Sequence, residues 1–281
     1  MKTNTLSKFY LYENSVQNPR WHVENLPKFH RQFIGVEPFS FREDFCGSGK
    51  IACEWVKKSS KNRAVGLDID QNAIKYAETV NKSELSRDEQ SRVKFIQQNV
   101  SRPTREKFDL IGAYNFSFFV LHERTELLNY FKAAHQSLKV TGTFFLDVAG
   151  GTGFLNTRLR EQTITLPKLG KVHQIWEQST YDPITSTNKY AIHFMLPSGE
   201  CLNDAFVYNW RVWQIRELRE ILKESGFDRT IVLWEGDNKS GGGSGEYFTT
   251  EAAANAHSWV AYLVGIKSGV GNERSRRKKM C

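Results

Sequence analysis

Residues 43–49 read EDFCGSG and join a predicted strand, 39–45, to a predicted helix, 49–58. Gly47 and Gly49 can adopt positive φ angles, which lets a ligand approach the backbone closely. The free N–H groups at the start of the following helix point to the same place, at the carboxyl edge of a sheet. The motif therefore predicts a ligand-binding turn between the first strand and the first helix of an α/β domain.

Strand-like and helix-like runs alternate after this turn. We expect strands at 63–67, 93–96, 108–114 and 143–148, and helices at 70–80 and 123–138. Helical spacers between strands are typical of βαβ units, which form a parallel sheet with helices on both faces. The sequence therefore predicts an α/β, Rossmann-like fold for this part of the chain.

The pattern changes after the fifth predicted strand. Turn signals separate apolar or alternating runs at 171–181, 189–196 and 201–208, which is typical of an antiparallel meander. We expect a helix at 214–225, strands at 230–234 and 259–266, and a flexible glycine-rich loop at 241–245. The predicted organisation is an N-terminal helical lid at 1–37, a main domain at 38–267 with an antiparallel cap insert at 168–212, and a basic disordered tail at 268–281.

Composition excludes several classes of protein. The 281 residues are 40% hydrophobic and 13% aromatic, so a large core can be buried. No apolar run reaches the roughly 18 residues that a membrane span needs, and the N-terminus has no secretory signal pattern. The four cysteines form no CxxC pair, which argues against structural zinc and against a disulfide framework. These features predict a cytoplasmic protein without a metal site, or a nuclear one if the basic tail acts as an address.

An acid follows the second predicted strand. Asp68 lies about twenty residues beyond the glycine turn, where an acid accepts hydrogen bonds from the two ribose hydroxyls of an adenosine. Gly47 and Gly49 also fit the dinucleotide fingerprint, so a nicotinamide-dependent oxidoreductase is one alternative. Glu43 and Asp44, however, would repel a pyrophosphate. A positively charged adenosine ligand such as S-adenosylmethionine is favoured.

Five runs in this order resemble the motif series of class I S-adenosylmethionine-dependent methyltransferases: EDFCGSG, AVGLDID, VKFIQQNV, FDLIGAYNFSF and LKVTGTFFLDV. The resemblance covers residues 38–148, and the closing strands extend it to about residue 267. It implies a seven-stranded sheet whose last strand is antiparallel to the others. It also implies S-adenosyl-L-methionine as the cofactor.

The resemblance also implies a set of cofactor-binding positions. Glu43 is the acid that ends the first strand, and Cys46, Gly47 and Gly49 surround the methionine part. Asp68 binds the ribose, Ile69 and Asp70 lie beside the adenine, and Asn99 with Val100 lies at the adenine amino group. Asn99 replaces the usual Asp, but its amide oxygen can still accept a hydrogen bond from the amine. Tyr12, in an aromatic segment at 9–21, is a candidate lid residue over the cofactor.

Candidate acceptor-binding residues follow the fourth strand. Asn115 is predicted both to contact the cofactor and to orient the acceptor. His122 is the best-placed histidine for a general base, or faces water. Phe116 and Phe118 either wall the substrate or belong to the core, and Tyr114 is a candidate substrate-binding residue at the same strand end. Asp147 binds substrate or holds a turn, and Arg211 is a candidate anchor for a substrate carboxylate.

We therefore predict methyl transfer from S-adenosylmethionine to a small polar acceptor, with nitrogen favoured over oxygen or carbon. An RNA or protein methyltransferase is an alternative, because the tail at 268–281 has five Lys or Arg residues against one Glu. The run NFSF lacks the prolines of the N-P-P-Y motif of amino-methylating DNA enzymes, which argues against nucleic acid. No membrane partner is expected, and no feature specifies an oligomeric state.

Overall fold

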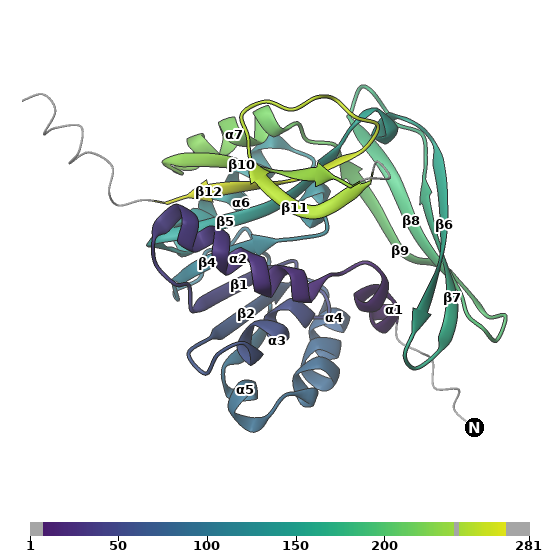
Figure 1. Ribbon diagram of the computed structural model, residues 1–281, viewed down its shortest axis with the longest axis horizontal. Helices are drawn as coiled ribbons and strands as arrows, with labels where there is room; N and C mark the ends of the chain where they lie inside the picture. The colour runs from purple at the N-terminus through teal and green to yellow at the C-terminus, as the bar shows by residue number, and fades with distance from the viewer. Residues whose placement is uncertain (1–7, 239–241, 268–281) are drawn as a thin grey trace, which may run out of the picture.

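The computed structural model describes residues 8–238 and 242–267, and these form two β-sheets with helices around the larger one (Figure 1). The main sheet has the strand order β11-β10-β12-β5-β4-β1-β2-β3. Its strands are β1 (Ser40–Asp44), β2 (Arg63–Asp68), β3 (Val93–Gln97), β4 (Phe108–Ala113), β5 (Leu138–Gly150), β10 (Arg229–Asp237), β11 (Gly243–Thr249) and β12 (Trp259–Ile266).

Strand direction in the main sheet confirms the predicted Rossmann-like class. The strands β1 to β5 pair in parallel with one another. By contrast, β12 is antiparallel to β5 and to β10. The sheet has eight strands rather than the expected seven, because β11 adds an antiparallel strand at the edge beside β10.

The extra strand corrects the prediction of a flexible loop at 241–245 for residues 243–245, while residue 241 lies outside the described residues. Residues from Gly243 onward belong to β11, which hydrogen-bonds to β10. A side chain from α2 (Pro19–Ile34) holds it in place, because Trp21 Nε1 donates to the Gly245 carbonyl at 2.9 Å. The Trp21 ring also lies 5.0 Å from the Tyr247 ring, between centroids. These long-range contacts of Trp21 stabilise β11, although its glycine-rich sequence disfavours a strand.

Helices cover both faces of the main sheet (Figure 1). Residues of α2 and α3 (Lys50–Lys57) share one buried cluster, and residues of α6 (Arg124–Ser137) and α7 (Ile215–Glu224) share another. Phe144 and Phe145 are consecutive on β5 and belong to opposite clusters, as strand alternation requires. Shorter helices, α4 (Gln71–Tyr76) and α5 (Arg87–Ser91), follow β2 and precede β3.

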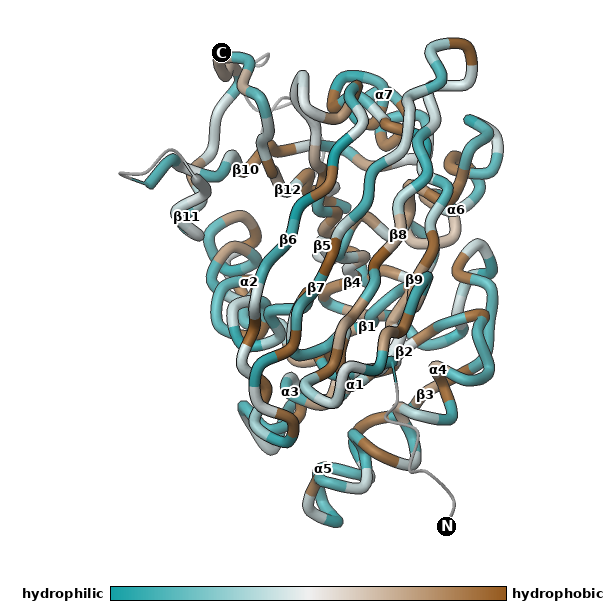
Figure 2. Tube along the Cα trace, turned by 90° about the vertical axis from the view of Figure 1, so that its right-hand side faces the viewer, coloured by the Kyte–Doolittle hydropathy of each residue, from teal (hydrophilic) through white to brown (hydrophobic). Residues whose placement is uncertain are grey.

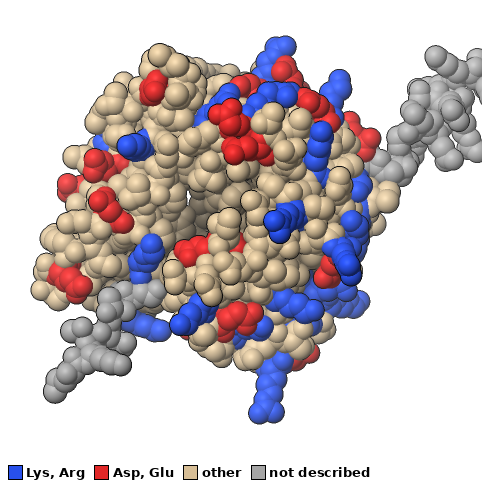
Figure 3. Space-filling model, turned by 180° about the vertical axis from the view of Figure 1, so that it is seen from behind, with Lys and Arg blue, Asp and Glu red and all other residues tan. Residues whose placement is uncertain are grey.

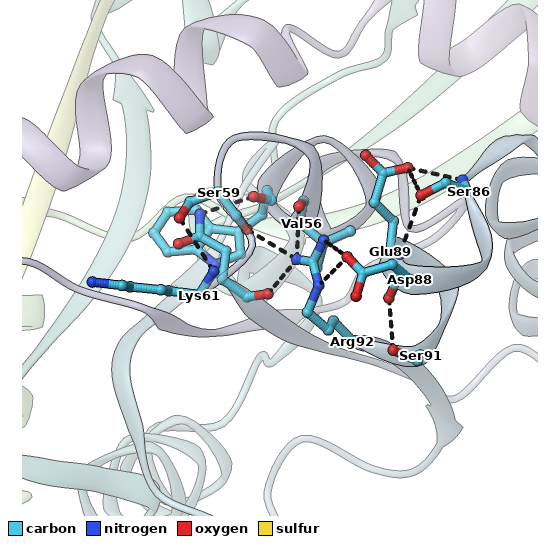
Figure 4. Close-up of polar contacts among 10 residues, drawn as sticks. Val56, Ser59, Lys61, Ser86, Asp88, Glu89, Ser91 and Arg92 are labelled. Carbon is cyan, nitrogen blue, oxygen red and sulfur yellow. Dashed lines mark hydrogen bonds and ion pairs between the residues drawn. The ribbon is translucent and has the colours of Figure 1, made fainter.

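Arg92 fixes the C-terminal end of α3 (Figure 4). Its Nη1 donates to the carbonyls of Val56, Ser59 and Asn62 at 2.7–3.0 Å, and its Nη2 pairs with Asp88 at 2.8 Å. Carbonyls at a helix end lack partners within the helix, so a guanidinium there stabilises the helix. The N-terminal end of α3 follows the glycine turn, and Arg92 therefore anchors the element that presents this turn.

A second sheet, here called the cap sheet, lies beside the carboxyl edge of the main one. It is antiparallel and consists of β6 (Arg158–Leu166), β7 (Gly170–Gln178), β8 (Thr187–Met195) and β9 (Cys201–Arg211). Figure 2 shows its four strands side by side, with mainly hydrophilic residues on β6. The cap sheet confirms the predicted antiparallel insert after the fifth strand and begins earlier in the chain than expected, at Arg158.

The N-terminal helix α1 (Lys8–Ser15) connects the cap sheet to the main domain. On the main-domain side, the Glu13 carboxylate accepts hydrogen bonds from Asn81 Nδ2 at 2.8 Å and from the Tyr76 hydroxyl at 3.3 Å. On the other side, Gln174 of β7 donates to Ser15 Oγ at 3.2 Å. In the described part of the chain, no helix is long and apolar enough to cross a membrane.

Candidate active site

A cavity of about 400 Å³ lies between the cap sheet and the carboxyl edge of the main sheet. Figure 3 shows a hollow between these two parts, walled mainly by uncharged residues. The cavity is lined from three sides: by Tyr12, Ser15 and Val16 of the N-terminal segment; by Asn115, Phe116, Ala149, Phe154, Ser258 and Val260 of the main domain; and by Arg158, Arg160, Gln162, Gln174, Trp176, Gln178, Tyr190 and Trp210 of the cap sheet.

A strained turn after β4 forms part of the cavity floor. Asn115 and Phe116 have φ angles of 57° and 56°, in the left-handed region that non-glycine residues rarely adopt. The buried Asp147 carboxylate accepts a hydrogen bond from each backbone N–H, at 2.6 Å from Asn115 and 2.8 Å from Phe116. Both oxygens of Asp147 therefore hold the turn in this conformation.

The placement of Asp147 decides between its two predicted roles. Burial raises the pKa of its carboxyl group to about 7, although the backbone hydrogen bonds act in the opposite direction. Its oxygens face the backbone, and it is not among the residues that line the cavity. The structure thus makes Asp147 the acid that holds the turn, and the prediction that it contacts substrate directly is not supported.

The glycine turn lies at the carboxyl ends of β1 and β2. Gly47 and Gly49 have φ angles of 52° and 68°. A Cβ atom at Gly49 would lie 2.2 Å from the Phe95 ring, whereas one at Gly47 would meet no atom within 4 Å. Asp68 accepts hydrogen bonds from Gly47 N at 2.8 Å and from Asp70 N at 2.9 Å. The turn thus has an open side at Gly47, next to the Asp68 carboxylate.

Glu43 and Cys46 pack behind this turn, on its buried side. Both side chains are buried, and Glu43 Oε2 accepts a hydrogen bond from Ala52 N at 2.8 Å, in the first turn of α3. Burial raises the pKa of Glu43 to about 8, and burial also raises the pKa of the Cys46 thiol. A ligand on the open side of the turn meets the backbone that these residues hold in place.

The residues predicted to lie beside the adenine differ in their exposure and in whether their side chains already have hydrogen-bond partners. Ile69 is 68% exposed and offers an apolar surface directly after Asp68. The Asp70 carboxylate caps α4 by accepting from Asn72 N at 2.8 Å, and Asn99 Oδ1 accepts from Ser101 N at 2.8 Å. Val100 is buried. Among these residues, only the Ile69 side chain is presented openly to solvent without such a local contact.

Two predicted substrate residues belong to the hydrophobic core. Tyr114 is 3% exposed, and its ring lies 4.3 Å from the ring of His22, beneath α2. Phe118 is fully buried and packs edge-on against Phe119 at 5.0 Å. Neither lines the cavity. Of its two predicted roles, Phe118 has the one in the core. Tyr114 lies in the other buried cluster, because the chain turns at Asn115, and this position does not support its predicted contact with substrate.

His122 and Arg211 hold the cap sheet to the main domain instead of facing the cavity. The His122 Nε2 lies 2.7 Å from the Asn209 carbonyl of β9, and Arg211 Nη1 donates to the His122 carbonyl at 2.7 Å. The guanidinium of Arg211 also lies over the Trp213 ring, 3.6 Å from its centroid. Neither residue lines the cavity, so the structure does not support the predicted roles of a general base and a carboxylate anchor.

Tyr12, Asn115 and Phe116 are predicted site residues that line the cavity. Tyr12 lies 4.7 Å from the Phe206 ring of β9, between centroids, and its hydroxyl hydrogen-bonds to Tyr208. Burial raises the Tyr12 pKa above its usual value, so the phenol stays protonated at neutral pH. It therefore acts as a neutral hydrogen-bonding group on the N-terminal side of the cavity.

The sequence analysis did not identify the β6 residues of the cavity. On β6, Arg158, Arg160 and Gln162 occupy alternate positions and share one side of the strand. Alternation in the run RLREQTITL was the available signal. Within the described ranges, no group of three His, Cys, Asp or Glu side chains is placed to bind a metal ion.

Residues 44–146 match a family model described as a methyltransferase domain. This segment is therefore a methyltransferase domain, and the fold of the chain is that of S-adenosylmethionine-dependent methyltransferases. The match covers the glycine turn, Asp68 and Asn115, and it agrees with the resemblance of the five sequence runs. CalS10 from Micromonospora echinaspora, an amino pentose methyltransferase whose structure has S-adenosylmethionine bound, is 11% identical to this chain with a TM-score of 0.63, covering 90% of this chain and 94% of its own. No curated protein matches the sequence of this methyltransferase.

Solved structures share the fold of the methyltransferase at low sequence identity. An S-adenosylmethionine-dependent methyltransferase from Clostridium acetobutylicum is 16% identical with a TM-score of 0.66, covering 92% of this chain and 97% of its own. The sugar N-methyltransferase KedS8 from Streptoalloteichus is 14% identical with a TM-score of 0.64, covering 92% and 91%. DesVI from Streptomyces venezuelae is 13% identical with a TM-score of 0.67, covering 92% and 95%.

Proposed function

We propose that this methyltransferase methylates a nitrogen atom of a small polar molecule bound in the cavity beneath the cap sheet. The cavity itself carries the proposal: about 400 Å³ is within the range of pockets that enclose small molecules. The similar fold of a sugar N-methyltransferase supports nitrogen as the acceptor atom.

The residues of the glycine turn fit the cofactor. Asp68 uses each oxygen for one backbone N–H, and a carboxylate has about four acceptor positions, so both oxygens can also accept from ribose hydroxyls. The open side of Gly47 gives room for the methionine part, and the exposed Ile69 offers an apolar surface to the adenine. We place Asp70, Asn99 and Val100 around the adenine as well.

When bound, the cofactor supplies an electrophilic methyl group on a sulfonium. The chain's contribution is to orient the acceptor and exclude water. Asn115 lines the cavity at the end of β4, and its position is fixed by Asp147. We assign the Asn115 amide to the acceptor nitrogen, and Phe116 and Trp210 to walls that keep water out.

The cavity lining also limits how a proton can leave the acceptor. Its residues include no Asp, Glu, His, Lys or Cys, and the pKa of Tyr12 is raised. A neutral amine attacks through its lone pair without prior proton transfer and loses its proton afterwards to solvent. The rate of methyl transfer should therefore rise as the pH passes the pKa of the acceptor amine, because only the neutral amine can attack.

A macromolecular acceptor is the second candidate. The basic tail at 268–281 that motivated it lies outside the described residues. An RNA or protein methyltransferase would show methyl transfer to macromolecules, with RNA binding that weakens steeply as salt rises.

Calorimetric titration with S-adenosylmethionine, S-adenosylhomocysteine and NAD tests the cofactor site. We expect micromolar binding of the two sulfur ligands and none of NAD. Labelled methyl transfer to glucosamine, with glucose as the matched hydroxyl compound, then tests the acceptor atom. Methylation of glucose but not glucosamine, or of RNA but neither sugar, would contradict the proposal.

A further inference from the structure

The cavity has a one-sided charge distribution. Of its seventeen lining residues, Arg158 and Arg160 are the charged ones. Both lie on β6, where they are exposed, and they share the cavity side with Gln162. Two cations at the rim of a cavity without a lining carboxylate give it a positive potential.

The register of the cap sheet places the two arginines beside two residues of β7, and these four side chains form a strip along the cavity. Arg158 lies opposite Gln178 of β7, and Arg160 lies opposite Trp176. Gln178 is already engaged, because its amide donates to the carbonyls of Gly153 and Asn156 at 3.0 and 2.7 Å. The strip therefore combines two guanidinium groups, a rigid amide and an indole ring.

Neither guanidinium has a hydrogen-bond or ion-pair partner among residues 8–238 and 242–267. The neighbouring acids, Glu161 and Glu177, alternate with the cavity-lining residues and so point to the other side of the sheet. Glu177 in addition contacts His193 at 3.2 Å. Guanidinium groups bind carboxylates and phosphates through paired hydrogen bonds, and these two have their donors available.

We infer that the methyl acceptor carries an anionic group, a carboxylate or a phosphate, which Arg158 and Arg160 bind at the rim of the cavity. The inference rests on the proposed function and names its substrate class. The anion is held at the β6 side, the body of the acceptor packs on Trp176, and the nitrogen is directed toward Asn115 at the main-sheet side. Neutral amines of the same size lack the rim contact.

Binding of matched probes to the full-length protein tests the inference. The probes are glucosamine, glucosamine 6-phosphate and glucosaminic acid, each titrated calorimetrically in the presence of saturating S-adenosylhomocysteine. We expect at least one anionic probe to bind about tenfold or more tightly than glucosamine. The tighter of the two anionic probes identifies phosphate or carboxylate as the preferred group.

The variants Arg158→Gln and Arg160→Gln should each weaken binding of the anionic probe. The double variant should bind that probe with an affinity within about twofold of its affinity for glucosamine. Their affinity for S-adenosylhomocysteine should not change. Arg216→Gln is the matched control, because Arg216 is exposed on α7 and, among the residues that the structure describes, forms its ion pair with Glu220. This control should bind every probe like the wild type.

Equal affinity of the wild type for neutral and anionic probes, including no measurable binding of any of them, would overturn the inference. That comparison uses the wild type alone, so it holds even if a variant fails to fold. Methyl transfer to glucosamine without any anionic preference would overturn the inference but leave the proposed function standing. Failure to bind S-adenosylhomocysteine would instead contradict the proposed cofactor site.

Discussion

Asp147→Asn is the sharpest test of the turn that forms the cavity floor. The substitution keeps the size of the side chain but leaves one acceptor oxygen where the carboxylate has two. Asn115 N and Phe116 N both donate to Asp147, so one buried donor loses its partner and faces an NH₂ group. Such a donor costs about 1–3 kcal/mol.

The local strain adds to this loss. Two consecutive left-handed residues cost roughly 1–3 kcal/mol each, and they persist only while the surroundings hold them. Without the full carboxylate the turn relaxes, and Asn115 moves within the cavity. A displacement of about 1 Å in a reacting site can lower the rate about a hundredfold. We expect the free energy of unfolding to fall by about 1–3 kcal/mol and kcat/KM by about ten- to a hundredfold.

Urea unfolding and initial rates of methyl transfer measure the two effects separately. Asp109→Asn is the control at the opposite edge of the sheet, where Oδ2 of Asp109 accepts from the backbone N–H groups of Phe39 at 3.1 Å and Ser40 at 2.9 Å. Its Oδ1 pairs with Lys139 at 2.8 Å, so this variant should lose stability through that ion pair and keep its rate. Equal rate losses in both variants, or a stable and active Asp147→Asn, would refute the role given to the turn.

Three further substitutions test other parts of the structure. Asp68→Ala should weaken S-adenosylhomocysteine binding by about 1.5–3 kcal/mol, measured by calorimetry, and unchanged affinity in a folded variant would remove Asp68 from the ribose site. Burial raises the pKa of Glu43 to about 8 in the folded state, so its protonated form stabilises the protein below the unfolded pKa and this stability is lost as pH rises toward 8. Glu43→Gln should remove that loss, seen as a flatter pH dependence of urea unfolding, and identical pH profiles would contradict it. Arg92→Lys should lower the free energy of unfolding by about 1–3 kcal/mol, because one ammonium cannot replace the fork that binds three carbonyls and Asp88; an unfolding curve like that of Arg216→Lys would argue against this.

Local patterns predicted the central strands because each is a short apolar run with a turn at its end. The edge strands were harder to predict. The cavity side of β6 consists of Arg158, Arg160 and Gln162, so the apolar alternation that marks a strand is weak there. The strand β11 begins with glycine and depends on pairing with β10 and on Trp21, which is more than two hundred residues away in the chain.

In the candidate site, too, local sequence patterns predicted some residues, whereas others depend on contacts between distant segments. The glycine turn and Asp68 are neighbours in consecutive βα units, so their spacing predicts their meeting. Tyr114 was assigned to the right strand end, but its side chain points to the α2 face, and only the packed structure reveals that direction. His122 and Arg211 meet through a contact between segments 89 residues apart, which no local pattern announces.

The position of α1 affects how many methyl groups the enzyme can add to an acceptor before the acceptor dissociates. Glu13 joins α1 to Asn81, which also donates to the Ser48 carbonyl of the glycine turn, while Tyr12 and Ser15 line the acceptor cavity. One helix thus lies against both the cofactor turn and the acceptor. Exchange of the spent cofactor by displacement of α1 would open both compartments together, so a monomethylated product would escape before a second transfer. We therefore expect distributive methylation, with the singly methylated amine accumulating ahead of any dimethylated form.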